Sequence, residues 1–151
     1  MQLSPHFTLE ALCKSDYALR SGIENSTADP AIIENLRRLC ERVLEPMRAH
    51  YGVPFEPNSG YRCLALNRAI GSQDNSQHVK GEAVDIEIPG MPNYDLALWI
   101  SQTLEFDQLI LEFYTPGVPA SGWVHVSLAA VNNRRQMLTI NKQQRLSGLV
   151  R

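Results

Sequence analysis

Three segments in the second half of the chain alternate between apolar and polar residues. This period of two is typical of β-strands that bury one face. The segments are residues 83–88, 108–113 and 123–128, and residues 137–140 predict a further strand. If the apolar faces all point at the core, the opposite face carries Asp85, Glu112 and His125. Pairing the second and third segments as a hairpin would bring Glu112 near His125.

Helical patterns precede these strands. Residues 7–22 predict a short helix that is capped by Thr8 and closed near Gly22. A longer helix begins with Asp29 as its cap and Pro30 in its first position, and Pro46 should kink or end it. A third helix begins near Asn93. Helices that precede a run of strands predict an α+β domain, in which helices cover one face of a small antiparallel sheet.

The chain has 151 residues, which predicts one domain over residues 1–151. Its net charge of −2 gives no reason to expect nucleic-acid binding. From Ala129 onward there are no acidic residues and five basic ones, which are Arg134, Arg135, Lys142, Arg145 and Arg151. This segment is either simply solvated or weakly attracted to an anionic polymer such as a bacterial cell wall.

The N-terminal sequence MQLSPHFTLEALCKSDYALR lacks the basic start and apolar core of a secretory signal, so synthesis in the cytoplasm is expected. No apolar run approaches the roughly 20 residues needed to span a bilayer.

Cys13, Cys40 and Cys63 cannot all pair within one chain and are not spaced like a zinc knuckle. Buried free thiols are expected at the first two positions.

The polar residues near and on the strands suit a zinc hydrolase when they are taken together. Catalytic zinc takes three ligands from His, Asp, Glu or Cys and keeps a fourth position for water. His78, Asp85 and His125 would supply two neutral imidazoles and one anion. A further carboxylate must accept a proton from the water, and Glu112 suits this role. Taken singly, each residue has an ordinary alternative, such as a loop histidine or an acid at a strand end.

The order of four motifs resembles the zinc D-Ala-D-Ala carboxypeptidase group of metallopeptidases, which is subfamily A of the peptidase M15 family. The motifs are SGYRC at 59–63, Asn67, SQHVKGEAVDI at 76–86 and GWVHVS at 122–127. They meet every fixed position of the family pattern SxHxxGxAxD followed by WxH, and the resemblance extends over residues 7–140. It implies a hedgehog/DD-peptidase-like fold, shared with the peptidoglycan-cleaving domains of phage endolysins and the hedgehog signalling domain.

Carried over residue by residue, the resemblance implies that His78, Asp85 and His125 hold one zinc ion per chain. Arg62 would hold a carboxylate or carbonyl of the substrate, with a structural arginine that braces its loop as the alternative. Gly81 would allow the turn that carries the first histidine over the strand. The residues implied to line the substrate site are Arg62, Ser76, Gln77 and Trp123. A core position is equally compatible with the tryptophan.

One position departs from the family pattern. Many members carry the catalytic acid three residues before the last histidine, in an ExxH arrangement, and here that position is Gly122. Some relatives use a glutamate from the neighbouring strand, which favours Glu112 as the general base, with Glu87 as the second candidate. If Glu112 does not reach the site, zinc binding without hydrolysis, as in hedgehog-type domains, is the alternative.

The resemblance therefore predicts a monomeric zinc-dependent peptidase that hydrolyses the peptide stems of bacterial peptidoglycan. It would be a D-Ala-D-Ala carboxypeptidase or an endolysin-type endopeptidase. The missing secretory signal fits a protein that reaches the cell wall by phage-type export or as part of a virion. One alternative is a non-catalytic zinc-containing module that binds the cell wall or builds a phage particle. The other is a domain that binds no metal. A ligand set of two histidines and one aspartate would also accept other divalent ions.

Overall fold

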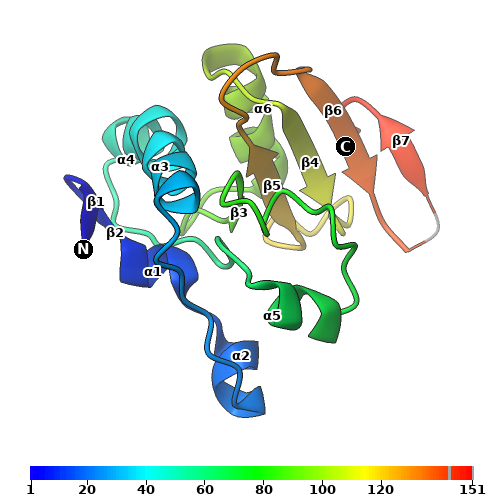
Figure 1. Ribbon diagram of the computed structural model, residues 1–151. Helices are drawn as coiled ribbons and strands as arrows, with labels where there is room; N and C mark the ends of the chain where they lie inside the picture. Colours follow the sequence, from blue (N-terminus) through cyan, green and yellow to red (C-terminus); the bar gives the residue numbers. More distant parts are fainter. Residues whose placement is uncertain (143, 151) are drawn as a thin grey trace.

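The computed structural model describes residues 1–142 and 144–150 (Figure 1). The helical elements are α1 (Leu9–Cys13), α2 (Asp16–Ser21), α3 (Pro30–Leu39), the π-helical η1 (Cys40–Leu44), α4 (Glu45–Tyr51), α5 (Leu64–Ala69) and α6 (Asn93–Thr103). The strands are β1 (Gln2–Ser4), β2 (Phe7–Thr8), β3 (Ala83–Ile86), β4 (Gln108–Glu112), β5 (Trp123–Ser127), β6 (Gln136–Ile140) and β7 (Arg145–Ser147). None of the helices in these ranges has the length and apolar character that crossing a bilayer requires.

The segment predicted as one helix over residues 7–22 forms two helices, α1 and α2. Thr8 caps α1, because its hydroxyl accepts a hydrogen bond from the Ala11 amide at 3.1 Å. Ser15 caps α2 in the same way through the Ala18 amide. The second cap explains the break, since a serine hydroxyl that bonds the backbone competes with continuation of the helix.

The long helix begins as predicted, with Asp29 as its N-cap and Pro30 in its first turn. Pro46 does not end it. The hydrogen-bonding pattern widens into the π-helical segment η1, whose last bond joins the Glu45 amide to the Cys40 carbonyl. Pro46 then lies in the first turn of α4. Proline is tolerated there because first-turn amides need no intrahelical acceptor.

Five strands form the main sheet in the order β3-β5-β4-β6-β7. β4 and β5 pair as the predicted antiparallel hairpin, and the β3·β5 and β6·β7 pairs are also antiparallel. β6 runs parallel to β4, so the sheet is mixed rather than purely antiparallel. The reason is that β5 ends beside the start of β4. The connection over residues 128–135 passes around this end and starts β6 there (Figure 1).

The helices cover the apolar face of the main sheet, as predicted. The strand residues on this face belong to one buried cluster with residues of α3, η1, α4 and α6; they are Val84, Ile86, Leu109, Leu111, Val124 and Val126. Helix α6 packs against β4 and β5 (Figure 1). The opposite face of the sheet is therefore available for polar side chains.

The three cysteines are free thiols. Cys13 and Cys40 lie in the buried cluster, as predicted, whereas Cys63 is partly exposed. Burial raises the pKa of Cys13 to about 11 and that of Cys40 to about 12, so both remain protonated at neutral pH.

Candidate metal centre

The strand register brings two of the predicted metal ligands together. Asp85 of β3 lies opposite His125 of β5, and His125 lies opposite Ile110 of β4 on its other side. Residues paired across neighbouring strands project from the same face. Glu112 and Trp123 form the next pair on that face, because side chains alternate with a period of two. All five side chains therefore lie on the face away from the helices.

The third predicted ligand, His78, comes from the loop before β3. The residue is only 2% exposed, and its Nδ1 lies 2.7 Å from the Gly60 carbonyl oxygen. A carbonyl oxygen can only accept, so Nδ1 carries the proton and the Nε2 lone pair is left for a metal. The His78 carbonyl in turn accepts a hydrogen bond from the Arg62 amide at 3.1 Å. The loop is thereby fixed to the SGYR segment.

Gly81 forms the turn between this loop and β3, as the sequence predicts. Its φ is +74°, a left-handed conformation that glycine adopts without a steric penalty. A Cβ at this position would lie 2.9 Å from the Ile32 carbonyl oxygen of α3. Glycine therefore allows the loop that carries His78 to pack closely on the helix.

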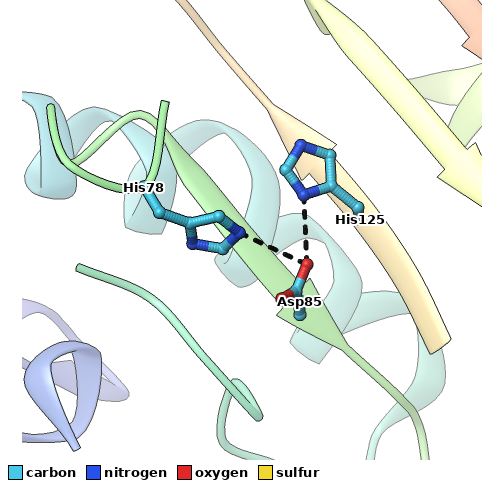
Figure 2. A group of neighbouring side chains, drawn as sticks. All are labelled: His78, Asp85 and His125. Atoms are coloured by element: carbon cyan, nitrogen blue, oxygen red, sulfur yellow. Dashed lines mark hydrogen bonds and ion pairs between the residues drawn. The ribbon is translucent and has the colours of Figure 1, made fainter. Parts of the chain in front are cut away.

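The three side chains converge on one point (Figure 2). Asp85 Oδ1 lies 3.4 Å from His78 Nε2 and 3.0 Å from His125 Nδ1. One possible ligand atom from each residue lies within 4.8 Å of the others. Two ligands that are each about 2.1 Å from a tetrahedral zinc ion lie about 3.4 Å apart. The separations from Asp85 therefore suit ligands that share one ion.

The protonation states also suit a metal ion. Burial lowers the pKa of His78, so its imidazole is neutral at pH 7. Burial acts to raise the pKa of Asp85, but the attraction and hydrogen bonds of His78 and His125 outweigh it and hold that pKa well below its ordinary range. A neutral imidazole and an ionised carboxylate are the forms in which these side chains bind divalent ions.

All eight predicted site residues line one cleft of about 840 Å³. They are Arg62, Ser76, Gln77, His78, Asp85, Glu112, Trp123 and His125. The cleft also has residues that the sequence interpretation did not select, among them Gln73, Asn75, Gln108, Ile110, Phe113, Arg134 and Arg145. The alternation in residues 108–113 already placed Gln108 and Ile110 on the face of the site. No local pattern indicated the two C-terminal arginines.

Glu112 lies at the end of β4 within this cleft. Burial raises its pKa, and the negative charge of Asp85 adds to this effect. Trp123 Nε1 donates a hydrogen bond to Glu112 Oε2 at 2.5 Å, and no residue in the described ranges donates to Oε1. A carboxylate with a raised pKa and one available oxygen has the properties of a general base.

Arg62 reaches the cleft from the loop before α5. Its Nε donates to Asn67 Oδ1 at 3.1 Å, and Asn67 is fully buried. Asn67 is itself held by a hydrogen bond from its Nδ2 to the Gln73 carbonyl at 2.7 Å. The Nη groups of Arg62 have no acceptor among residues 1–142 and 144–150, so they can bind a substrate carboxylate or carbonyl. Asn67 entered the sequence analysis only as part of a motif, and the structure shows that it positions Arg62.

Gly122 explains the departure from the ExxH pattern. Its φ is +67°, and a Cβ at this position would overlap the carbonyl oxygen of Glu112. Any side chain here, acidic or not, would force the end of β4 away from the start of β5. At this end of the cleft the carboxylate comes from Glu112 instead.

Two side chains lie elsewhere than the sequence suggested. Glu87, the second candidate for the base, lines a different cleft, and its carboxylate accepts hydrogen bonds from Asn58 at 2.9 Å and Asn93 at 3.3 Å. The alternation over residues 108–113 predicts Phe113 on the core face together with Leu109 and Leu111, but the φ of +55° at Phe113 ends the strand one residue earlier. Its ring stacks on Trp123 with centroids 5.2 Å apart and lines the cleft.

The basic C-terminal segment is only partly solvated. Arg134 contacts the Asp107 carboxylate at two points, with Nε–Oδ1 and Nη2–Oδ2 distances of 3.0 and 2.8 Å. Arg135 donates to backbone carbonyls at the end of α6, whereas Lys142 is exposed. Arg151 lies outside the described residues. Attraction of this segment to an anionic polymer stays a prediction.

A family model described as peptidase M15 matches residues 5–127, which is most of the chain. The chain belongs to the peptidase M15 family. The match contains all eight predicted site residues and ends before β6, so the predicted relationship is confirmed over a slightly shorter range. Peptidase M15 proteins are metal-dependent peptidases, in agreement with the candidate centre at His78, Asp85 and His125. No curated protein matches the chain with significant similarity.

Proposed function

We propose that this peptidase M15 member is a zinc-dependent enzyme that hydrolyses peptide bonds in the stems of bacterial peptidoglycan, acting on the cell wall as a monomer. The observation that carries the proposal is the convergence of His78, Asp85 and His125 in one cleft with the available carboxylate oxygen of Glu112. The substrate class rests on the resemblance of the sequence motifs to zinc D-Ala-D-Ala carboxypeptidases. A carboxypeptidase and an endolysin-type endopeptidase both fall within this proposal.

The donor set suits one zinc ion per chain. His78 Nε2, His125 Nδ1 and Asp85 Oδ1 are two imidazole nitrogens and one carboxylate oxygen, which is a ligand set used in zinc hydrolases. The Gly60 carbonyl holds the His78 ring from behind and fixes its tautomer, as such partners of metal ligands commonly do. When bound, zinc would supply Lewis-acid polarisation of the scissile carbonyl and acidify a water molecule.

Glu112 would handle the proton. Its carboxylate accepts a proton from the attacking water and returns it to the leaving amine, so that it is ionised again at the end of the cycle. The Trp123 N–H holds Oε2, which leaves Oε1 available for this proton transfer. A pKa raised by burial makes this carboxylate a stronger base than an exposed glutamate.

Arg62 and the loop before β3 would position the substrate. Arg62 is held at Nε by Asn67 and offers its Nη donors to a substrate carboxylate or carbonyl. Ser76 accepts a hydrogen bond from the His78 amide at 3.3 Å, and Gln77 donates to Asp107 at 3.0 Å. These bonds hold the loop while its side chains line the cleft.

The proposal is tested by measuring metal content together with dye release from labelled peptidoglycan, for wild type and Glu112→Gln. About one zinc per chain is expected in both. Hydrolysis should fall by about 10²- to 10⁴-fold in the variant, because a general base contributes that much to the rate. Glu41→Gln, an exposed residue of η1 outside the cleft, is the matched control and should behave as wild type.

Each other outcome rejects a defined part of the proposal. Hydrolysis that survives in Glu112→Gln would exclude Glu112 as the base. Zinc without hydrolysis of peptidoglycan or stem peptides would favour a non-catalytic binding module. Absence of metal from the wild-type protein, even after zinc is added, would reject the metal centre itself.

A further inference from the structure

The main sheet continues beyond the candidate metal centre into two strands that the family match does not include. β6 and β7 follow β4 in the sheet, whereas the match ends at residue 127. The registers place Trp123, Glu112, Ile140 and Arg145 in one row across β5, β4, β6 and β7. Paired residues project from the same face, so Arg145 lies on the face that carries Glu112.

Arg145 is a cation of the cleft that has no partner among the described residues. It is exposed and lines the same cleft as the metal ligands. No residue in the ranges 1–142 and 144–150 forms an ion pair or hydrogen bond with its guanidinium. Arg134, by contrast, is already paired with Asp107 at 2.8 Å. Ile140 separates Arg145 from Glu112 in the row, so these two charges are not adjacent.

The row also gives a length scale for the substrate. Neighbouring strands lie about 4.8 Å apart, so the backbones of Glu112 and Arg145 are separated by two such steps, or about 10 Å. An extended peptide advances about 3.4 Å per residue. A peptide that lies across the sheet with its cleaved bond at Glu112 therefore brings a group about three residues away to Arg145.

We propose that Arg145 binds a carboxylate of the substrate about three residues from the cleaved bond, so that acidic stem peptides are preferred to their amidated counterparts. This inference rests on the proposed function and names a specificity residue for it. A guanidinium presents paired N–H donors that match the two oxygens of a carboxylate. The two strands beyond the family match would thus lengthen the substrate groove.

The test uses two synthetic peptides, L-Ala-γ-D-Glu-L-Lys-D-Ala-D-Ala and the same peptide with the free α-carboxyl of D-Glu converted to a carboxamide. Wild type should show a KM for the acidic peptide about three- to tenfold lower than for the amide, the range of a partly exposed charged contact. In Arg145→Gln this preference should disappear, because the KM for the acidic peptide should rise to that for the amide. Lys142→Gln removes the same charge from the same hairpin but outside the cleft, and should keep the preference.

The outcomes separate this inference from the proposed function. Equal effects of Arg145→Gln on both peptides would overturn the inference, because the residue would then act through general charge or shape. If neither wild type nor any variant cleaves either peptide or labelled peptidoglycan, the proposed function fails. The inference is then decided by calorimetric binding of the same two peptides to the zinc-loaded protein, where equal affinities in wild type would overturn it.

Discussion

Opposing effects within the cleft act on the pKa of Glu112. Burial and the charge of Asp85 raise its pKa, whereas the hydrogen bond from Trp123 Nε1 favours the ionised form. A general base must be ionised at the working pH and still bind a proton readily. The indole N–H therefore tunes the residue on which the proposed chemistry depends, in addition to orienting it.

Trp123→Phe should move the acidic limb of the kcat/KM profile to higher pH. The change keeps an aromatic ring but removes the N–H donor, so the pKa of Glu112 would rise further. Because the base must be ionised, hydrolysis is then lost at a higher pH as the solution is acidified. The measurement is hydrolysis of a stem peptide as a function of pH.

Trp99→Phe is the matched control for this prediction. Trp99 stacks on His50 with ring centroids 4.5 Å apart and does not line the cleft. Its substitution should leave the acidic limb in place. An acidic limb that stays unchanged in Trp123→Phe as well would show that Glu112 is not the titrating base.

The β4–β5 hairpin positions Glu112 and Trp123 beside each other. Two of its residues adopt left-handed conformations. Phe113 and Gly122 flank the connection between the strands, with φ of +55° and +67°. The Phe113 amide donates to the Ile140 carbonyl at 2.7 Å, and its ring stacks on Trp123. Backbone strain of about 1–3 kcal/mol at a non-glycine residue is often found at functional sites. Here it places an aromatic ring on the wall of the cleft.

Gly122→Ala should lower the free energy of unfolding by about 2–5 kcal/mol. About 1–2 kcal/mol arises from the left-handed backbone, and the remainder from overlap of the new Cβ with the Glu112 carbonyl. Gly117→Ala is the control, because its φ is +85° but no atom lies within 4 Å of a Cβ there. It should lose only the backbone contribution in chemical denaturation. Equal losses in the two variants would contradict a close contact at Gly122.

At the scale of the whole molecule, the helices and the site occupy opposite faces of one sheet. The three candidate ligands come from a loop, from β3 and from β5, so the centre exists only when these elements are assembled. Side chains that are assembled only by folding bind a metal in the folded state alone. Metal binding and folding are therefore expected to be coupled, and both should depend on pH.

The metal-free protein should lose stability as the pH falls below about 6.5, the ordinary pKa of histidine. His78 and Asp85 both have pKa values lowered in the folded state, so the unfolded chain binds more protons. The stability from these groups is therefore present above their unfolded pKa values and is lost on acidification, first at His78 and below about pH 4 at Asp85. Urea denaturation with a chelator at several pH values would measure this loss.

Added zinc should stabilise the same protein at pH 7.5 by about 2.7 kcal/mol when its free concentration is 100 times the dissociation constant. The gain should shrink at acid pH, because the ligands bind zinc only when deprotonated. His125→Ala should lose most of the gain. Zinc stabilisation that is unchanged in this variant would place the metal elsewhere.

Local patterns in the sequence were sufficient to predict which face of each strand is buried and which residues belong to the motifs. Alternation placed Asp85, Glu112 and His125 on one face, and the register confirms that arrangement. The caps at Thr8 and Asp29 likewise start helices where the sequence predicts them. Each of these features depends on side chains that are close together in the chain, so a short window of sequence is sufficient to read it.

Other features were decided by contacts between distant residues. No local pattern predicts that β6 runs parallel to β4, that Gly122 lies against the Glu112 carbonyl, or that Asn67 holds Arg62. The position of Arg145 in the cleft depends on the order of four strands. Strand order and register are set by packing the whole sheet against its helices, and a short window of sequence does not contain that information. The sequence by itself therefore determined the candidate ligands and the family, whereas the tertiary structure decided which carboxylate and which arginines share their cleft.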